Sequence, residues 1–178
     1  MTEAEGAVLL FIQEHLRTQL LDPFMTAVTT LGDSGLIWIA AALLLLCFRR
    51  YRGCGAAVLL ALLIGALVTN VILKNAVARI RPYEVIEGLR ILVDAPHDYS
   101  FPSGHSTSSV AAAAVMLRCL PRRFGVPAAV LAALICLSRL YVGVHYPTDV
   151  LAGALIGLLA AFASERCLRR FAPPPLRP

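Results

Sequence analysis

Charged residues are scarce in this chain. Only 15% of its 178 residues are Asp, Glu, Lys or Arg, whereas 58% are hydrophobic and the mean hydropathy is +0.75. A soluble domain of this length carries more charge, so the composition argues against one. Apolar residues instead dominate several long runs, which predicts an integral membrane protein with multiple helices.

The chain also lacks paired cysteines and a basic stripe. Its five cysteines form no C-x-x-C pair and lie within or at the ends of apolar runs, which favours packing roles over disulfides or metal ligation. The net charge of +5 comes from basic residues interleaved with the apolar runs, so nucleic acid is not an expected partner. Residues 1–11 are acidic where a signal peptide is basic, so we expect no cleavable signal.

The apolar runs predict an all-α, polytopic transmembrane bundle of five or six spans. Residues 1–31 have apolar residues at near-helical spacing with polar residues between them, which is typical of an interfacial helix or a partial span. Residues 1–170 then form a single membrane-embedded domain, and the proline-rich residues 171–178 form a disordered tail. Five runs are expected to cross the bilayer: 36–48, 54–73, 103–117, 124–140 and 147–168.

Arginines indicate the orientation of these spans. If the spans alternate, the loops after the first and third spans and the tail fall on one face, which the positive-inside rule assigns to the cytoplasm. The polar breaks at the other ends of the spans fall on the opposite face. We therefore expect a multi-pass protein of the cell membrane whose active site is extracytoplasmic. The arginines of the cytoplasmic face are Arg49, Arg50, Arg52, Arg118, Arg122, Arg123, Arg166, Arg169, Arg170 and Arg177.

The first polar cluster, KNAVARIRP, covers Lys74 to Pro82 at the end of the second span. Lys74 and Arg81 are seven residues apart, which is two helical turns, so a helix would present both on one face. Two permanent cations on one face require an anion. The alternative is that Lys74, Arg79 and Arg81 anchor a helix end among lipid headgroups.

The second cluster, FPSGH, marks the start of the third span at Phe101 to His105. Ser103 is a good N-cap, and Gly104 lets the backbone approach a ligand closely. The free amides of a helix start bind anions, so His105 in the first turn would point at whatever these amides hold. The alternative is a solvated histidine at a helix start.

The third cluster, SRLYVGVHYPTD, breaks the apolar sequence between Ser138 and Asp149. Pro147 suits the first position of a new helix, so Asp149 falls in the first turn and can reach back to His145. A carboxylate on one imidazole nitrogen leaves the other free as a base, a metal ligand or a nucleophile. Arg139 supplies a planar, permanent cation suited to phosphate. The alternative is a histidine that caps a helix end.

A hairpin of the third and fourth spans brings the second and third clusters to the same side of the membrane. Two histidines, a carboxylate, three cations and helix-start amides would then meet in one place. Such a grouping favours phosphoryl transfer, which depends mainly on positioning and charge neutralisation.

Together, the clusters resemble the three motifs of the type 2 phosphatidic acid phosphatase and vanadium haloperoxidase superfamily. The motifs Lys-x6-Arg-Pro, Pro-Ser-Gly-His and Ser-Arg-x5-His-x3-Asp are complete and in order between Lys74 and Asp149. The resemblance implies that His145 takes the phosphoryl group as a phosphohistidine and that Asp149 orients it. It implies that His105 protonates the departing oxygen and then activates water. The implied phosphate cradle is Lys74, Arg81, Ser103, Gly104 and Arg139.

The resemblance implies chemistry without a metal or cofactor, and no carboxylate pair suited to magnesium lies beside these residues. By analogy with small bacterial members, the short connection at 83–101 and the outward-facing site favour undecaprenyl diphosphate, taken from the bilayer and cleaved to the monophosphate. The alternatives are a phosphatidylglycerophosphate or phosphatidic acid phosphatase, or a lipid phosphotransferase.

Two other classes compete with a lipid phosphatase. The five apolar runs disfavour a vanadium haloperoxidase, because those relatives are soluble, and the complete motifs disfavour a non-catalytic scaffold. Three polar residues of the 83–101 connection lie outside the motifs, and we expect them to be solvated. They are Asp94, His97 and Asp98.

Overall fold

The computed structural model describes residues 2–171, with side chains from 3 to 168. All regular structure in that range is helical, as predicted. The 3-10 turn η1 and the π-helix η2 interrupt the α-helices. In chain order the elements are α1 Thr2–His15, α2 Leu21–Leu31, η1 Asp33–Gly35, α3 Leu36–Cys47, α4 Arg52–Ala66, η2 Leu67–Leu73, α5 Lys74–Val77, α6 Pro82–Val85, α7 Gly104–Cys119, α8 Arg122–Tyr141 and α9 Pro147–Phe171.

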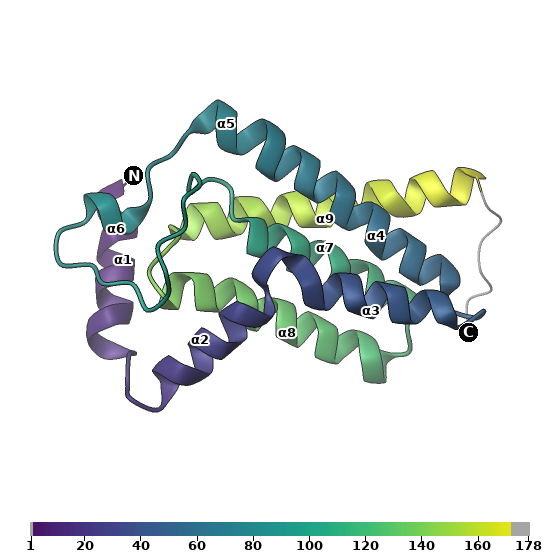
Figure 1. Cartoon of the computed structure of the whole chain (residues 1–178), viewed down its shortest axis with the longest axis horizontal. Helices are drawn as coiled ribbons and strands as arrows, with labels where there is room; N and C mark the ends of the chain where they lie inside the picture. Colours follow the sequence, from purple (N-terminus) through teal and green to yellow (C-terminus); the bar gives the residue numbers. More distant parts are fainter. Residues whose placement is uncertain (1, 172–178) are drawn as a thin grey trace.

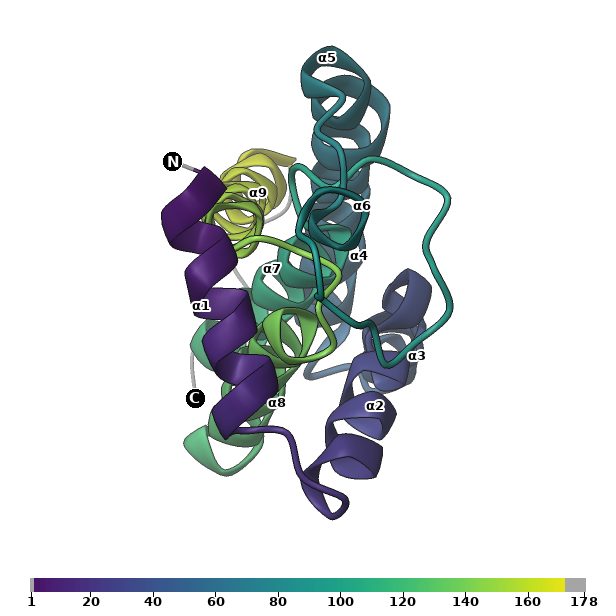
Figure 2. The same cartoon turned by 90° about the vertical axis from the view of Figure 1, so that its left-hand side faces the viewer.

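Helix α7 lies at the centre of the bundle, where it packs against α4, α8 and α9 (Figures 1 and 2). Where α9 crosses α7, a Cβ atom on Gly153 would lie 2.5 Å from the carbonyl oxygen of Ser103. A Cβ atom on Gly157 would lie 2.6 Å from the carbonyl oxygen of Thr107. Small residues therefore bring these two backbones into close contact, as they do between helices in lipid.

The polar ends of the helices meet at one end of the bundle. The start of α7, the end of α8 and the start of α9 lie towards the left of Figure 1, where the chain also leaves α5. The α3–α4 and α7–α8 turns lie at the opposite end. The three sequence clusters therefore share one end of the molecule, as the hairpin topology predicts.

Helix α1 crosses this polar end at a steep angle to the bundle helices (Figures 1 and 2). Leu9 is buried against Leu89 and Tyr146. The guanidinium of Arg17, just after α1, donates to the carbonyl oxygens of Tyr141 and Arg90, both at 2.7 Å. These contacts fix the N-terminal segment to the end of the bundle that carries the polar clusters.

Among the described residues, fewer helices are long and apolar enough for membrane spans than the five or six predicted. Residues 52–85, 122–141 and 147–168 are long and apolar enough to cross a bilayer. A fourth span arises if α2 and α3, which are bent by 44° at η1, count as one. Helix α7 has 16 residues and is about 24 Å long, which is shorter than a typical hydrocarbon core of about 30 Å.

Of the predicted tail, residues 172–178 lie outside the described residues, and α9 runs to Phe171.

Candidate active site

The first cluster does not present its cations on a single helix, so that prediction was wrong. Ala78 adopts a left-handed conformation with φ +48°, which ends α5, and Arg81 is extended with ψ 150°. Pro82 favours this extended backbone, because its ring clashes with a helical residue before it. Lys74 and Arg81 nevertheless converge, because both bind the carboxylate of Asp98.

Asp98 is therefore not the freely solvated loop residue that the sequence suggested. Lys74 contacts one of its carboxylate oxygens and Arg81 the other, although 54% of the side chain is exposed. Burial opposes ionisation, but the hydrogen bonds and charges of Lys74 and Arg81 outweigh it and lower the pKa of Asp98 to about 2. The cradle cations thus hold an anion that the protein itself supplies.

Ser103 caps helix α7, as its position predicts. Its hydroxyl accepts from the amide of Ser106 at 3.4 Å, and its own amide donates to the carbonyl oxygen of Asp149 at 3.0 Å. Ser103 is fully buried, and its hydroxyl caps the helix without lining the neighbouring cavity. Gly104 does line that cavity.

His105 lies beside a carboxylate that sequence reasoning missed. Its Nε2 is 2.8 Å from Oδ1 of Asp33, which comes from the break between α2 and α3. The imidazole therefore has a carboxylate partner at hydrogen-bond distance.

His145 and Asp149 face each other across the start of α9. Nδ1 of His145 is 3.5 Å from Oδ2 of Asp149, which is longer than an ideal hydrogen bond. Oδ2 also accepts from the amide of Tyr146 at 2.9 Å and from the hydroxyl of Ser100. Among the described residues, Nε2 of His145 has no hydrogen-bond partner.

The surroundings of His145 keep its ring neutral. Burial lowers its pKa to about 3, and the positive charges of Arg139 and Arg81 act in the same direction, while Asp149 opposes them. At neutral pH the imidazole therefore carries a free lone pair, which a nucleophile requires.

Arg139 is buried at the end of α8. Its Nη1 donates to the hydroxyl of Thr29 at 2.6 Å. Its Nε is a buried donor without a partner in the described part of the chain. An unpaired buried donor is costly, so the position is suited to an anionic acceptor.

A cavity of about 1360 Å³ connects these groups. Six of the eight predicted site residues line it, and the two that do not, Ser103 and Asp149, are buried. Apolar side chains of α3 and α4 also line the cavity, including Ile39, Leu59 and Leu62. The lining thus combines cations with apolar side chains, which fits an amphipathic phosphate. The six lining residues are Lys74, Arg81, Gly104, His105, Arg139 and His145.

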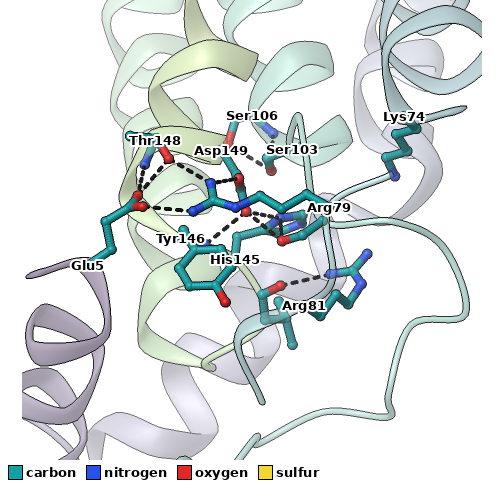
Figure 3. Close-up of polar contacts among 12 residues, drawn as sticks. Glu5, Lys74, Arg79, Arg81, Ser103, Ser106, His145, Tyr146, Thr148 and Asp149 are labelled. Atoms are coloured by element: carbon teal, nitrogen blue, oxygen red, sulfur yellow. Dashed lines mark hydrogen bonds and ion pairs between the residues drawn. The ribbon is translucent and has the colours of Figure 1, made fainter. Parts of the chain in front are cut away.

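Arg79, which sequence reasoning left outside the site, contacts Asp149 directly, and Glu5 contacts Arg79 and Thr148. The alternative interpretation of the first cluster had Arg79 anchor a helix end among headgroups, whereas its Nη1 donates to Oδ1 of Asp149 at 2.6 Å (Figure 3). Glu5 comes from α1 and binds Arg79. No local pattern identifies either contact, because Glu5 is 74 residues from Arg79 in sequence.

No metal-ligand cluster is found among the residues that the structure describes. Within that part of the chain, no group of three or more His, Cys, Asp and Glu side chains could hold a metal ion. The donors around the cavity are mainly cations and imidazoles, which suit an anion.

Comparisons with known proteins agree with this geometry. An undecaprenyl-diphosphatase of Sulfolobus acidocaldarius is 36% identical over 128 residues, which are 72% of this chain and 62% of the relative. A crystal structure of Aquifex aeolicus LpxE superposes with a TM-score of 0.78 at 28% identity, covering 90% of this chain and 93% of that one. A transmembrane PAP2 type phosphatidylglycerolphosphate phosphatase from Bacillus subtilis gives a TM-score of 0.77 at 29% identity, covering 96% and 87%.

The family match includes all three clusters. The model of the PAP2 superfamily matches residues 55–172, which contain every predicted site residue and exclude α1, α2 and α3. That match covers more than half of the chain. The chain therefore belongs to the PAP2 superfamily.

Proposed function

We propose that the protein is a metal-independent membrane phosphatase that hydrolyses a lipid phosphate or diphosphate through a phosphohistidine. The observation that carries this proposal is a cavity lined by two histidines, three cations and apolar side chains of α3 and α4. A lipid phosphate has the matching shape: a compact anion at one end and apolar chains at the other.

In the first step, the lone pair of His145 Nε2 attacks phosphorus, and the bond from phosphorus to the leaving oxygen breaks. His105 gives its proton to that oxygen. Lys74, Arg81 and Arg139 neutralise the charge on the remaining phosphoryl oxygens. Asp149 accepts the hydrogen bond from Nδ1 and stabilises the positive ring that forms.

In the second step, His105 takes a proton from water, and the water oxygen attacks phosphorus. The bond between phosphorus and His145 Nε2 breaks, which returns the neutral imidazole and releases phosphate. Asp33 lies 2.8 Å from Nε2 of His105 and holds the ring in place during both proton transfers.

Undecaprenyl diphosphate, cleaved to undecaprenyl phosphate, is the substrate we favour. The relative from Sulfolobus acidocaldarius bears the name undecaprenyl-diphosphatase, and the large cavity accommodates a diphosphate. Phosphatidylglycerophosphate is the second candidate, because the Bacillus subtilis structural neighbour bears that activity in its name. Transfer of the phosphoryl group to another lipid uses the same first step.

We further propose five crossings within one domain of residues 1–170, with α2 and α3 as one bent span and α7 as a short one. The α3–α4 turn, which contains Arg49 and Arg50, and the α7–α8 turn, which Arg118 and Arg122 flank, lie at the end of the bundle opposite the three clusters; this supports an extracytoplasmic site. On a background without native cysteines, an impermeant maleimide should label Glu87→Cys in intact cells and leave Arg123→Cys unlabelled. The reverse pattern would contradict this orientation.

The function is tested by phosphate release from detergent-purified protein in EDTA. Undecaprenyl diphosphate, phosphatidylglycerophosphate and phosphatidic acid are compared, and the fastest substrate identifies the lipid. His145→Ala should abolish release, whereas His15→Ala, which removes an exposed histidine of α1, should retain it. Absence of release from all three lipids by the wild-type protein would refute hydrolysis of these substrates.

A further inference from the structure

Asp149 is bound through both of its carboxylate oxygens, and the partner of Oδ1 is Arg79, which occupies one of the six unspecified positions of the Lys-x6-Arg-Pro motif. Oδ2 faces His145 and the amide of Tyr146, while Oδ1 accepts from Nη1 of Arg79 at 2.6 Å. Because a carboxylate is planar and rigid, the hydrogen bond at Oδ1 restricts the direction in which Oδ2 points. Arg79 therefore helps to set the geometry between Asp149 and His145.

Arg79 is itself held by Glu5 of helix α1. Nη2 of Arg79 donates to Oε2 of Glu5 at 2.7 Å (Figure 3). The other oxygen, Oε1, accepts from the amide of Thr148 at 3.0 Å and from its hydroxyl at 2.6 Å. The guanidinium also lies 3.8 Å from the ring centre of Tyr146. Arg79 is thus fixed on three sides.

Glu5 is buried, with 8% of its surface exposed. A buried carboxylate is stable only when it is paired and hydrogen-bonded. Burial raises the pKa of Glu5, but the hydrogen bonds from Thr148 and Arg79 outweigh it and give a net lowering. Glu5 therefore remains negative and balances the charge of Arg79 at close range.

We propose that Glu5 is a positioning residue for the nucleophile, acting through Arg79 on Asp149 and from there on His145. This inference rests on the proposed phosphatase function. Without Glu5, the guanidinium loses one of its anchors and its charge acts on Asp149 without compensation. Asp149 then stabilises the positive ring of phosphohistidine less well, because the uncompensated charge of Arg79 draws the negative charge of the Asp149 carboxylate towards Oδ1 and away from His145.

Glu5 lies in a part of the chain that the family model does not match, which begins at residue 55. Helix α1 thus contributes to the reaction centre as well as covering the end of the bundle (Figure 2). The phosphate cradle does not involve Glu5, because Lys74 and Arg81 lie on the other side of His145 from Glu5 (Figure 3). Loss of Glu5 should therefore slow the chemical step and have little effect on substrate binding.

The test compares Glu5→Gln, Arg79→Gln and the double variant in steady-state turnover and in the single-turnover rate of phosphoenzyme formation. Glu5→Gln should lower kcat and the phosphorylation rate about 10-fold, as removal of an outer partner of a functional ligand commonly does, with KM within about twofold. Glu3→Gln is the matched control, because Glu3 lies on the same helix and is exposed. It should match the wild type.

The double variant decides whether Glu5 acts through Arg79. If it does, Glu5→Gln should add little to the loss already caused by Arg79→Gln. Unchanged kcat in Glu5→Gln, losses that multiply in the double variant, or equal losses in kcat and phosphate affinity would each overturn the proposal. A wild-type protein that releases no phosphate would instead count against the proposed function. In that case, the melting temperatures of the wild type and Glu5→Gln would measure the ion pair between Glu5 and Arg79 directly. A melting temperature unchanged by Glu5→Gln would also reject the proposed coupling.

Discussion

Replacement of Asp98 by asparagine should tighten the binding of phosphate. The carboxylate of Asp98 occupies the two cradle cations, with Lys74 on one oxygen and Arg81 on the other. A phosphate group that enters the cavity requires the same two partners, so Asp98 competes with it. Asparagine has nearly the same volume and no charge, so it removes the competition without opening a cavity.

The size of the effect follows from the pKa of Asp98, which falls from its ordinary 3.8 to about 2. At 1.36 kcal/mol for each pH unit, this fall corresponds to about 2.4 kcal/mol of net attraction between the carboxylate and its surroundings. Because 54% of the side chain is exposed, solvent screening reduces this net attraction to about 1 kcal/mol. The inhibition constant of inorganic phosphate should then fall about fivefold.

The assay is inhibition of lipid phosphate hydrolysis by inorganic phosphate at pH 7. Asp94→Asn is the matched control, because Asp94 lines the same cavity, is exposed and changes the net charge equally. Its inhibition constant should stay near that of the wild type. Equally tighter phosphate binding in both variants would indicate that only the net charge of the protein matters. Weaker phosphate binding in Asp98→Asn would show that the carboxylate orients the cations. Either result would refute the reasoning.

Three further predictions follow from local geometry. Asp33→Asn removes the carboxylate next to His105 and should lower kcat about 10-fold with little change in KM, measured by steady-state phosphate release. Gly153→Ala forces a Cβ atom against the carbonyl oxygen of Ser103, so it should destabilise the α7–α9 contact by about 1–3 kcal/mol and lower the melting temperature in detergent. The lowered pKa of Asp98 adds stability that is present above about pH 4 and is lost as the pH falls towards 2. Acid unfolding of Asp98→Asn should therefore lack this part of the pH dependence.

The sequence predicted the elements that local patterns encode. Apolar runs located the bundle helices, and Ser103 and Pro147 marked the starts of α7 and α9 where the structure has them. The three motifs identified the family because each is a short segment at a helix end. The hairpin of α7 and α8 brings two of those segments together, as the topology predicted.

Other features depend on conformation or on distant contacts, so the sequence did not reveal them. The two-turn spacing of Lys74 and Arg81 suggested one helix, but Ala78 takes a left-handed conformation and the chain becomes extended. Asp98 looked like an ordinary loop residue, because its partners lie 24 and 17 residues away. Glu5 is separated even further from the residues that it contacts, and only the path of α1 across the bundle brings it there.

The central claim is that His145 carries the phosphoryl group during turnover. The most direct measurement is rapid quenching of the protein in EDTA with a substrate whose terminal phosphate is radiolabelled, followed by peptide mapping. We expect a label that is labile in acid and stable in alkali, lies on the peptide containing His145, and is absent from His145→Ala. A label on another residue, or turnover that persists in His145→Ala, would contradict the account.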